Sequence, residues 1–127
     1  MGGKSKIQLE YIINCSPKVL YNRLSTAAGL AEWFAENVTV KGKVYSFVWD
    51  QIEHFAEKTL HKENQLVRYS WVEGEDEESY FEFRITQDEL TNDVSLIVTD
   101  FAEERETEQA KNLWDTQIAD LKHILGS

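Results

Sequence analysis

The sequence predicts an α+β domain in which a curved antiparallel sheet of about six to seven strands packs against one long C-terminal helix. Hydrophobic residues alternate with a period of two over residues 38–101, in short segments separated by turn-forming residues. Residues 103–125 instead show the spacing of an amphipathic helix. Because consecutive strand segments lie close together in sequence, hairpins must join them, so the sheet is antiparallel.

The N-terminal part predicts one strand followed by two short helices. Residues 7–14, IQLEYIIN, alternate like a strand, and Ser16 then offers an N-cap with Pro17 at the first helical position. The pair Ser25–Thr26 offers a second N-cap. The second helical segment carries an apolar face at i, i+3, i+4 spacing, made of Leu30, Trp33 and Phe34. Two short helices can turn and close one end of a curved sheet, with Trp33 and Phe34 placed as a plug or gate.

The remaining strands and the final helix follow in order. The strand candidates are residues 38–40, 43–49, 52–61, 66–72, 79–86 and 94–101. The sequence predicts the last helix from residue 103, with Glu103 at its positive N-terminal end, Lys122 and His123 at its negative C-terminal end, and Gly126 as its stop. Its apolar stripe can cover one face of the sheet, and the space between the two becomes either a core or a pocket.

Length and charge limit the possible functions. The 127 residues fit a single domain, 1–127, in which residues 1–6 are expected to be disordered. The formal net charge of −10 disfavours nucleic acid and anionic membranes as partners. No apolar run reaches the roughly 18 residues of a membrane span, so we expect a cytoplasmic protein. The single cysteine, Cys15, cannot form an intrachain disulfide and is interpreted as a buried structural thiol.

Several segments together carry a resemblance to a known family. They are Ser16–Leu24, GLAEWF (29–34), VRYSW (67–71), YFEFRI (80–85), SLIVTDF (95–101) and LWDTQIADLKHIL (113–125). Their order resembles the helix-grip fold of the START and Bet v 1-like (SRPBCC) superfamily, and most closely its branch similar to the activator of Hsp90 ATPase homologue. The resemblance implies a hydrophobic small molecule held between sheet and helix, and this branch also implies protein partners. A few members of the superfamily are cyclases.

Aromatic residues recur on one side of three predicted strands. They are Tyr45, Phe47 and Trp49 on the first, Tyr69 and Trp71 on the second, and Phe81 and Phe83 on the third. These stripes would suit either an aromatic-lined pocket or a solid core, and a cavity of about 300 Å³ or more would favour the pocket. Glu82 and Arg84 lie on the opposite face, where we expect a solvated charge pair.

The histidines and carboxylates form no catalytic or metal motif. His54 and His61 are seven residues apart in one strand, which places them on opposite faces unless a bulge intervenes, so no metal site is expected. His54 shares its face with apolar Ala56 and Leu60, and is either a satisfied core histidine or a ligand contact. The chain has no nucleophile elbow and no glycine-rich phosphate loop, and no cofactor is implied.

Three functional hypotheses follow. The first is a non-enzymatic domain that binds a small hydrophobic or aromatic ligand. Its candidate residues are Phe47, Trp49, Trp71 and Phe83 as walls, Trp33 and Trp114 as lining or gate, and His54 and Tyr69 as orienting groups. The second is a protein-interaction domain with a packed core, which would bind a partner such as a chaperone. Its acidic stretches at 73–78 and 102–108 would contact that partner. The third is cyclase or hydrolase chemistry at His54. For all three hypotheses the chain is either a monomer or a homodimer.

Overall fold

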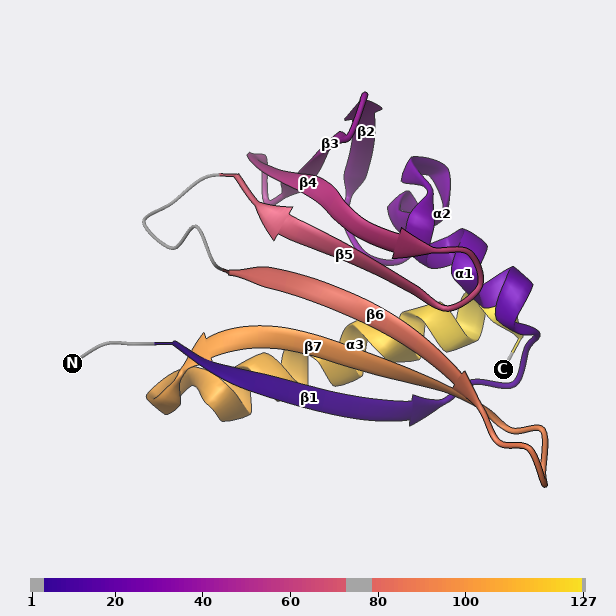
Figure 1. Ribbon diagram of the computed structural model, residues 1–127. Helices are drawn as coiled ribbons and strands as arrows, with labels where there is room; N and C mark the ends of the chain where they lie inside the picture. The colour runs from indigo at the N-terminus through magenta and orange to yellow at the C-terminus, as the bar shows by residue number, and fades with distance from the viewer. Residues whose placement is uncertain (1–3, 73–78, 127) are drawn as a thin grey trace.

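The structure is a computed structural model that describes residues 4–72 and 79–126. One sheet wraps around a C-terminal helix, and two short helices lie at one end of the sheet (Figure 1). The elements are β1 (Lys4–Ile12), α1 (Pro17–Ser25), α2 (Ala27–Ala31), β2 (Asn37–Lys41), β3 (Val44–Trp49), β4 (Ile52–Lys62), β5 (Leu66–Trp71), β6 (Tyr80–Gln87), β7 (Val94–Glu103), the short 3₁₀ helix η1 (Glu104–Glu106) and α3 (Thr107–Leu125). The predicted α+β fold class and its element order are confirmed.

The sheet has seven strands in the order β1-β7-β6-β5-β4-β3-β2, and every neighbouring pair is antiparallel. Strands β2 to β7 follow one another as hairpins, as their sequence spacing predicts. The first strand instead pairs with the last, with Leu9 opposite Val98. The chain therefore crosses from one sheet edge to the other between β1 and β2, and α1 and α2 make this crossing (Figure 1).

The two short helices begin at the predicted caps. The Ser16 hydroxyl accepts a hydrogen bond from the Val19 N–H (3.2 Å), and the Thr26 hydroxyl accepts one from the Gly29 N–H (2.9 Å). The second helix is shorter than predicted, because it ends at Ala31. Trp33 and Phe34 follow it in a turn, where the backbone N–H of each donates to the Leu30 carbonyl.

Both ends of the chain differ from the sequence-based boundaries. Strand β1 begins at Lys4, so the expectation of disorder over residues 1–6 is wrong for residues 4–6, while residues 1–3 lie outside the described part. Pairing with β7 orders this segment. Helix α3 begins at Thr107 rather than at residue 103, because β7 continues through Glu103. The helix ends at Leu125, and Gly126 caps it with a φ of 73°, the left-handed conformation that suits glycine.

The concave face of the sheet carries the core. The aromatic stripes of β3, β5 and β6 point to this side as predicted, and Phe47, Tyr69 and Phe83 are fully buried there. Helix α3 covers the same face and contributes three buried side chains, Trp114, Ile118 and Leu121. At 19 residues this helix is about 28 Å long, enough to lie along β1 and β7, which it contacts.

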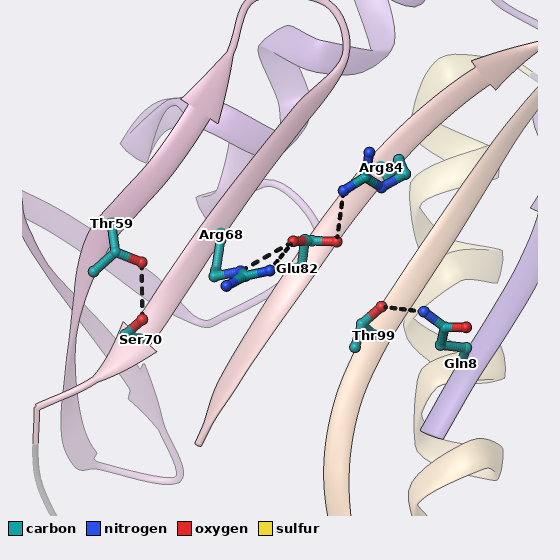
Figure 2. Close-up of polar contacts among 7 residues, drawn as sticks. All are labelled: Gln8, Thr59, Arg68, Ser70, Glu82, Arg84 and Thr99. Carbon is teal, nitrogen blue, oxygen red and sulfur yellow. Dashed lines mark hydrogen bonds and ion pairs between the residues drawn. The ribbon is translucent and has the colours of Figure 1, made fainter. Parts of the chain in front are cut away.

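The opposite face carries a charge cluster around Glu82. The Glu82 side chain accepts hydrogen bonds from Arg68 Nε (3.0 Å) and Nη2 (2.8 Å), and Arg84 Nη2 lies 3.6 Å from its other oxygen (Figure 2). Arg84 is therefore a partner of Glu82, as predicted. The prediction of a solvated Glu82 is wrong, since only 5% of the residue is exposed. Arg68, which stacks over the Tyr80 ring on the neighbouring strand, covers it.

Gly29 allows α1 and α2 to pack closely. A Cβ atom at this position would lie 2.5 Å from the Asn22 carbonyl oxygen and 2.8 Å from the Arg23 Cα. Helix propensity alone would make Gly29→Ala stabilising by up to about 1 kcal/mol. We expect the backbone clash to reverse that sign and to lower the free energy of unfolding by about 1–3 kcal/mol, measured by urea denaturation.

The matched control is Ala28→Gly, at an exposed position of the same helix. It should lower the free energy of unfolding by no more than about 1 kcal/mol, through helix propensity alone. An increase in stability for Gly29→Ala would show that the two helices do not need this close approach.

Candidate functional site

A pocket of about 420 Å³ lies between the sheet and α3. Four strands and the helix contribute to it, together with the turn that follows α2. Its lining is mostly aromatic, and consists of Phe34, Trp49, Trp71, Phe81, Asp100, Leu113, Trp114 and Gln117. The volume falls within the range of small-molecule sites, which are apolar concavities with a few placed polar groups. Here those polar groups are Asp100 and Gln117.

Asp100 lies on β7 and its carboxylate is held by two donors. One oxygen accepts a hydrogen bond from the Trp114 indole N–H (2.8 Å) and the other from the Phe101 backbone N–H (2.8 Å). Burial raises the pKa of Asp100, and these two hydrogen bonds and the charge of Lys4 oppose that rise only in part. The pocket therefore contains a carboxyl group whose charge is incompletely compensated.

The Phe34 carbonyl joins the sheet to the helix beside the pocket. It accepts hydrogen bonds from the Trp49 indole N–H (2.8 Å) on β3 and from the Gln117 side-chain amide (3.0 Å) on α3. The Phe34 ring stacks on Trp114 with centroids 5.7 Å apart. The residue thus fixes the orientation of two pocket tryptophans, one through its carbonyl and one through its ring.

A second pocket of about 470 Å³ lies on the other side of this contact. It shares Phe34, Trp49 and Gln117 with the first pocket and opens between Trp33 and the C-terminal half of α3. The three shared residues therefore form the wall between two adjacent spaces. A further groove of about 360 Å³ lies at the opposite end of α3, beside Lys4 and Phe101.

The structure brings together three of the eight predicted site residues at the first pocket, Trp49, Trp71 and Trp114. Two others are fully buried beside it in the core, Phe47 and Phe83. The remaining aromatic candidates, Trp33 and Tyr69, bond to backbone carbonyls of α1.

The bonds of Trp33 and Tyr69 give each a clear packing role. The Trp33 indole N–H donates to the Arg23 carbonyl (2.9 Å), and the Tyr69 hydroxyl donates to the Leu24 carbonyl (2.7 Å). Burial also raises the pKa of Tyr69, which keeps its hydroxyl protonated as a donor. Both side chains attach α1 to the core rather than lining the first pocket.

His54 lies at the pocket's margin, and its ring centroid is 5.6 Å from Trp49 and 6.3 Å from Trp71. A bulge between Lys58 and Leu60 shifts the register of β4, so His61 lies opposite the buried Val67. The bulge thus places His54 and His61 on the same face, which is the exception that the sequence prediction allowed. The prediction that His54 and Leu60 share a face is wrong, because Leu60 lies opposite Arg68. Over residues 4–72 and 79–126, no group of three or more His, Cys, Asp or Glu side chains is placed to hold a metal ion.

Sequence reasoning placed Phe81 in an aromatic stripe that could line a pocket, but it missed Asp100, Gln117 and Leu113 as lining residues. Asp100 had a recognisable signal, because it continues the alternation of Val94, Leu96 and Val98 and so points to the same inner face. A carboxylate at the end of an otherwise apolar inward series is the pattern that indicates a polar group in a pocket.

Cys15 is only partly buried, which corrects the expectation of a buried thiol. Burial nevertheless raises the pKa of the Cys15 thiol, against a smaller opposing effect of the Leu20 backbone. A raised pKa leaves little thiolate at neutral pH, which argues against a nucleophilic role.

Comparisons with known proteins identify the superfamily to which this fold belongs. A family model for the START-like superfamily domain matches residues 1–127. The chain belongs to the START-like superfamily. The resemblance seen in its sequence is thereby confirmed. No curated protein matches the chain.

Solved structures of similar proteins agree with this assignment. The solution structure of BfR322 from Bacteroides fragilis is 34% identical, covers 96% of this chain and 91% of that one, and superposes with a TM-score of 0.69. The Aha1 dimer from Colwellia psychrerythraea is 19% identical over 93% of each chain, with a TM-score of 0.79. MLL2253 from Mesorhizobium loti is 18% identical over 96% of this chain and 97% of that one, with a TM-score of 0.79. The last two likenesses show the fold alone.

The raised pKa of Asp100 gives stability a specific pH dependence. The folded protein keeps this proton to a higher pH than the unfolded chain, so ionisation of Asp100 lowers the free energy of unfolding as pH rises above about 4. Asp100→Asn resembles the protonated side chain and removes this loss. The quantity to compare is the free energy of unfolding of Asp100→Asn minus that of the parent, measured by urea unfolding at each pH across about pH 3–8. We expect this difference to be lowest near pH 3 and to increase with pH.

The control for this prediction is Glu89→Gln, an exposed carboxylate in the β6–β7 turn whose removal changes net charge equally. Its stability should follow that of the parent across the same range. Parallel curves for Asp100→Asn and the parent would contradict the raised pKa of Asp100.

Proposed function

We propose that this START-like domain is a non-enzymatic binding module that holds a small hydrophobic or aromatic ligand between the sheet and α3. The observation that carries the proposal is the pocket of about 420 Å³, with five aromatic side chains and two polar groups in its lining. A ligand there would replace water against apolar rings, which supplies affinity, while Asp100 and Gln117 would fix its orientation.

The proposal gives roles to named residues. Trp49, Trp71 and Phe81 form the sheet side of the pocket, while Trp114 forms the helix side. Phe34 packs between these two sides, with its ring 5.1 Å from both Trp49 and Phe81. Leu113, of which 59% is exposed, lies at the mouth of the pocket.

A binding role accounts for this pocket better than catalysis does. Asp100 is the one acidic or basic side chain among the described lining residues, and both of its oxygens already accept hydrogen bonds. The cyclase or hydrolase hypothesis assigned the chemistry to His54, and His54 lies outside the lining of this pocket. The pocket therefore does not contain the side chain on which that hypothesis depended.

Protein partners form a secondary proposal. The second proposal is a homodimer or a complex with a chaperone. The solved Colwellia psychrerythraea protein is an Aha1 dimer, but at 19% identity its likeness extends to the fold only. Acidic residues 73–78 lie outside the described part of the chain, so the predicted docking stretch there stays a prediction. No described helix is both long and apolar enough to cross a membrane, and a cytoplasmic location is part of this proposal.

Ligand binding is tested with N-phenyl-1-naphthylamine, a neutral aromatic probe whose fluorescence increases in apolar surroundings. We expect saturable binding with one probe per chain. Leu113→Trp adds bulk at the mouth without disturbing the core, and should weaken binding at least about tenfold, a change of about 1.4 kcal/mol. Probe fluorescence is measured during titration of each variant.

Leu90→Trp is the matched control, since Leu90 is 94% exposed in the β6–β7 turn, away from the pocket. It introduces the same side chain and should leave the probe affinity unchanged. Native mass spectrometry of freshly purified protein adds an independent test, because it reports a copurified ligand and the subunit number together. Absence of saturable probe binding by the parent protein would contradict the proposed function.

A further inference from the structure

The hydrogen-bonding capacity left in the pocket consists mainly of acceptors. Tryptophan can donate only one hydrogen bond, through its indole N–H. Trp49 and Trp114 have already used theirs, on the Phe34 carbonyl and on Asp100. Gln117 donates one of its two amide hydrogens to Phe34, which leaves its second N–H and its side-chain oxygen. Trp71 adds one indole N–H to the lining. A ligand therefore meets aromatic faces, these two neutral donors, an amide oxygen and the free positions of a carboxylate.

Asp100 can accept more hydrogen bonds than the protein supplies. An ionised carboxylate offers about four lone-pair positions, and Phe101 and Trp114 occupy two of them. The described lining residues include no Lys, Arg or His. Lys4 acts on Asp100 from β1, but the ion pairs found among residues 4–72 and 79–126 do not include Asp100. The pocket thus contains a carboxylate that lacks a countercharge within it.

The rings around this carboxylate complete a site suited to a cation. Aromatic faces attract cations through the negative charge at the centre of the ring, most strongly for tryptophan. Trp49 and Trp71 lie 6.4 Å apart at an interplanar angle of 61°, and Phe81 lies 5.1 Å from Trp71. Rings that meet at such angles present differently oriented faces within one small volume. The net charge of −10 also favours the approach of cations over anions.

We propose that the ligand of this pocket is an amphipathic organic cation, an aromatic or apolar molecule carrying one protonated amine that pairs with Asp100 while its apolar part lies among the tryptophans. The inference rests on the proposed binding function and names the ligand class for the same pocket. The ligand's ammonium group donates to the free positions of the carboxylate and supplies the missing countercharge. An anionic ligand such as a fatty acid would face Asp100 without a compensating group.

A series of three probes with the same ring system tests this ligand class. They are 1-naphthylmethylamine, which is cationic at neutral pH, the neutral 1-naphthalenemethanol and the anionic 1-naphthoate. We expect the parent protein to bind the amine at least about tenfold more tightly than the alcohol, the effect of one charge-assisted hydrogen bond. The naphthoate should bind most weakly. Dissociation constants are measured by isothermal titration calorimetry at physiological salt, which screens long-range attraction.

Two variants then test whether the preference for the amine over the alcohol depends on Asp100. Asp100→Asn should reduce the ratio of amine to alcohol affinity to near one, because the amide keeps the shape of the side chain but cannot supply the countercharge to the ammonium group. Glu89→Gln removes one negative charge from an exposed turn and should keep the parent's ratio. Circular dichroism establishes that each variant is folded. The probe series on the parent protein is decisive by itself if Asp100→Asn does not fold.

The outcomes separate this inference from the proposed function. If the alcohol and N-phenyl-1-naphthylamine bind saturably but the amine shows no advantage, the pocket binds ligands and the cationic class is wrong. If the naphthoate binds more tightly than the amine, the cationic class is also wrong. If none of the four probes binds the parent protein, the proposed function itself fails. An amine preference that survives in Asp100→Asn would overturn the role given to that carboxylate.

Discussion

The insertion of Phe34 between the sheet and α3 is the contact on which the rest of the structure depends. Its ring lies 5.1–6.1 Å from six other aromatic rings, contributed by the preceding residue, the two strands β3 and β6, and the helix α3. Aromatic pairs contribute about 0.5–1.5 kcal/mol each beyond the burial of their area, so this cluster stabilises the domain by several kcal/mol. Its carbonyl holds Trp49 and Gln117 at the same time. One residue thereby fixes the distance between the two layers and the shape of the space left between them.

The broken helix before Phe34 has a physical reason. Ser16 and Thr26 cap two short helices in succession, and Gly29 lets them approach closely. The chain can then turn across the end of the sheet and direct Phe34 inward. A single continuous helix would carry this side chain past the sheet's end, and the inner face would lack its central ring.

Asp100 shows how stability and a binding site compete within the same small core. Burial raises its pKa, so the ionised form lowers the free energy of unfolding at neutral pH. The buried carboxylate on the outer face of the sheet, that of Glu82, differs from Asp100 because it has two cationic partners, Arg68 and Arg84 (Figure 2). The same type of side chain is thus fully paired on one face and left with free acceptor positions on the other, where the pocket lies.

The element order, the caps of α1 and α2 and the inward face of each aromatic stripe could be predicted from the amino-acid sequence. These features depend on local rules, namely the periods of strand and helix and the capping of backbone N–H groups. Trp49, Trp71 and Trp114 could be proposed as site residues for the same reason. Residue-by-residue alternation failed in β4, because the bulge at Lys58–Leu60 reverses the face of His61 and depends on pairing with β5.

Tertiary packing separates the inward-facing side chains that form the core from those that line the pocket. Phe47 and Phe83 are fully buried, whereas Trp49 and Trp71 are only partly buried and line the pocket, although all four show the same pattern in sequence. The environment of Asp100 likewise depends on Trp114, which lies 14 residues away on another element. Packing between distant segments sets these outcomes, and the period of a single strand contains no information about it.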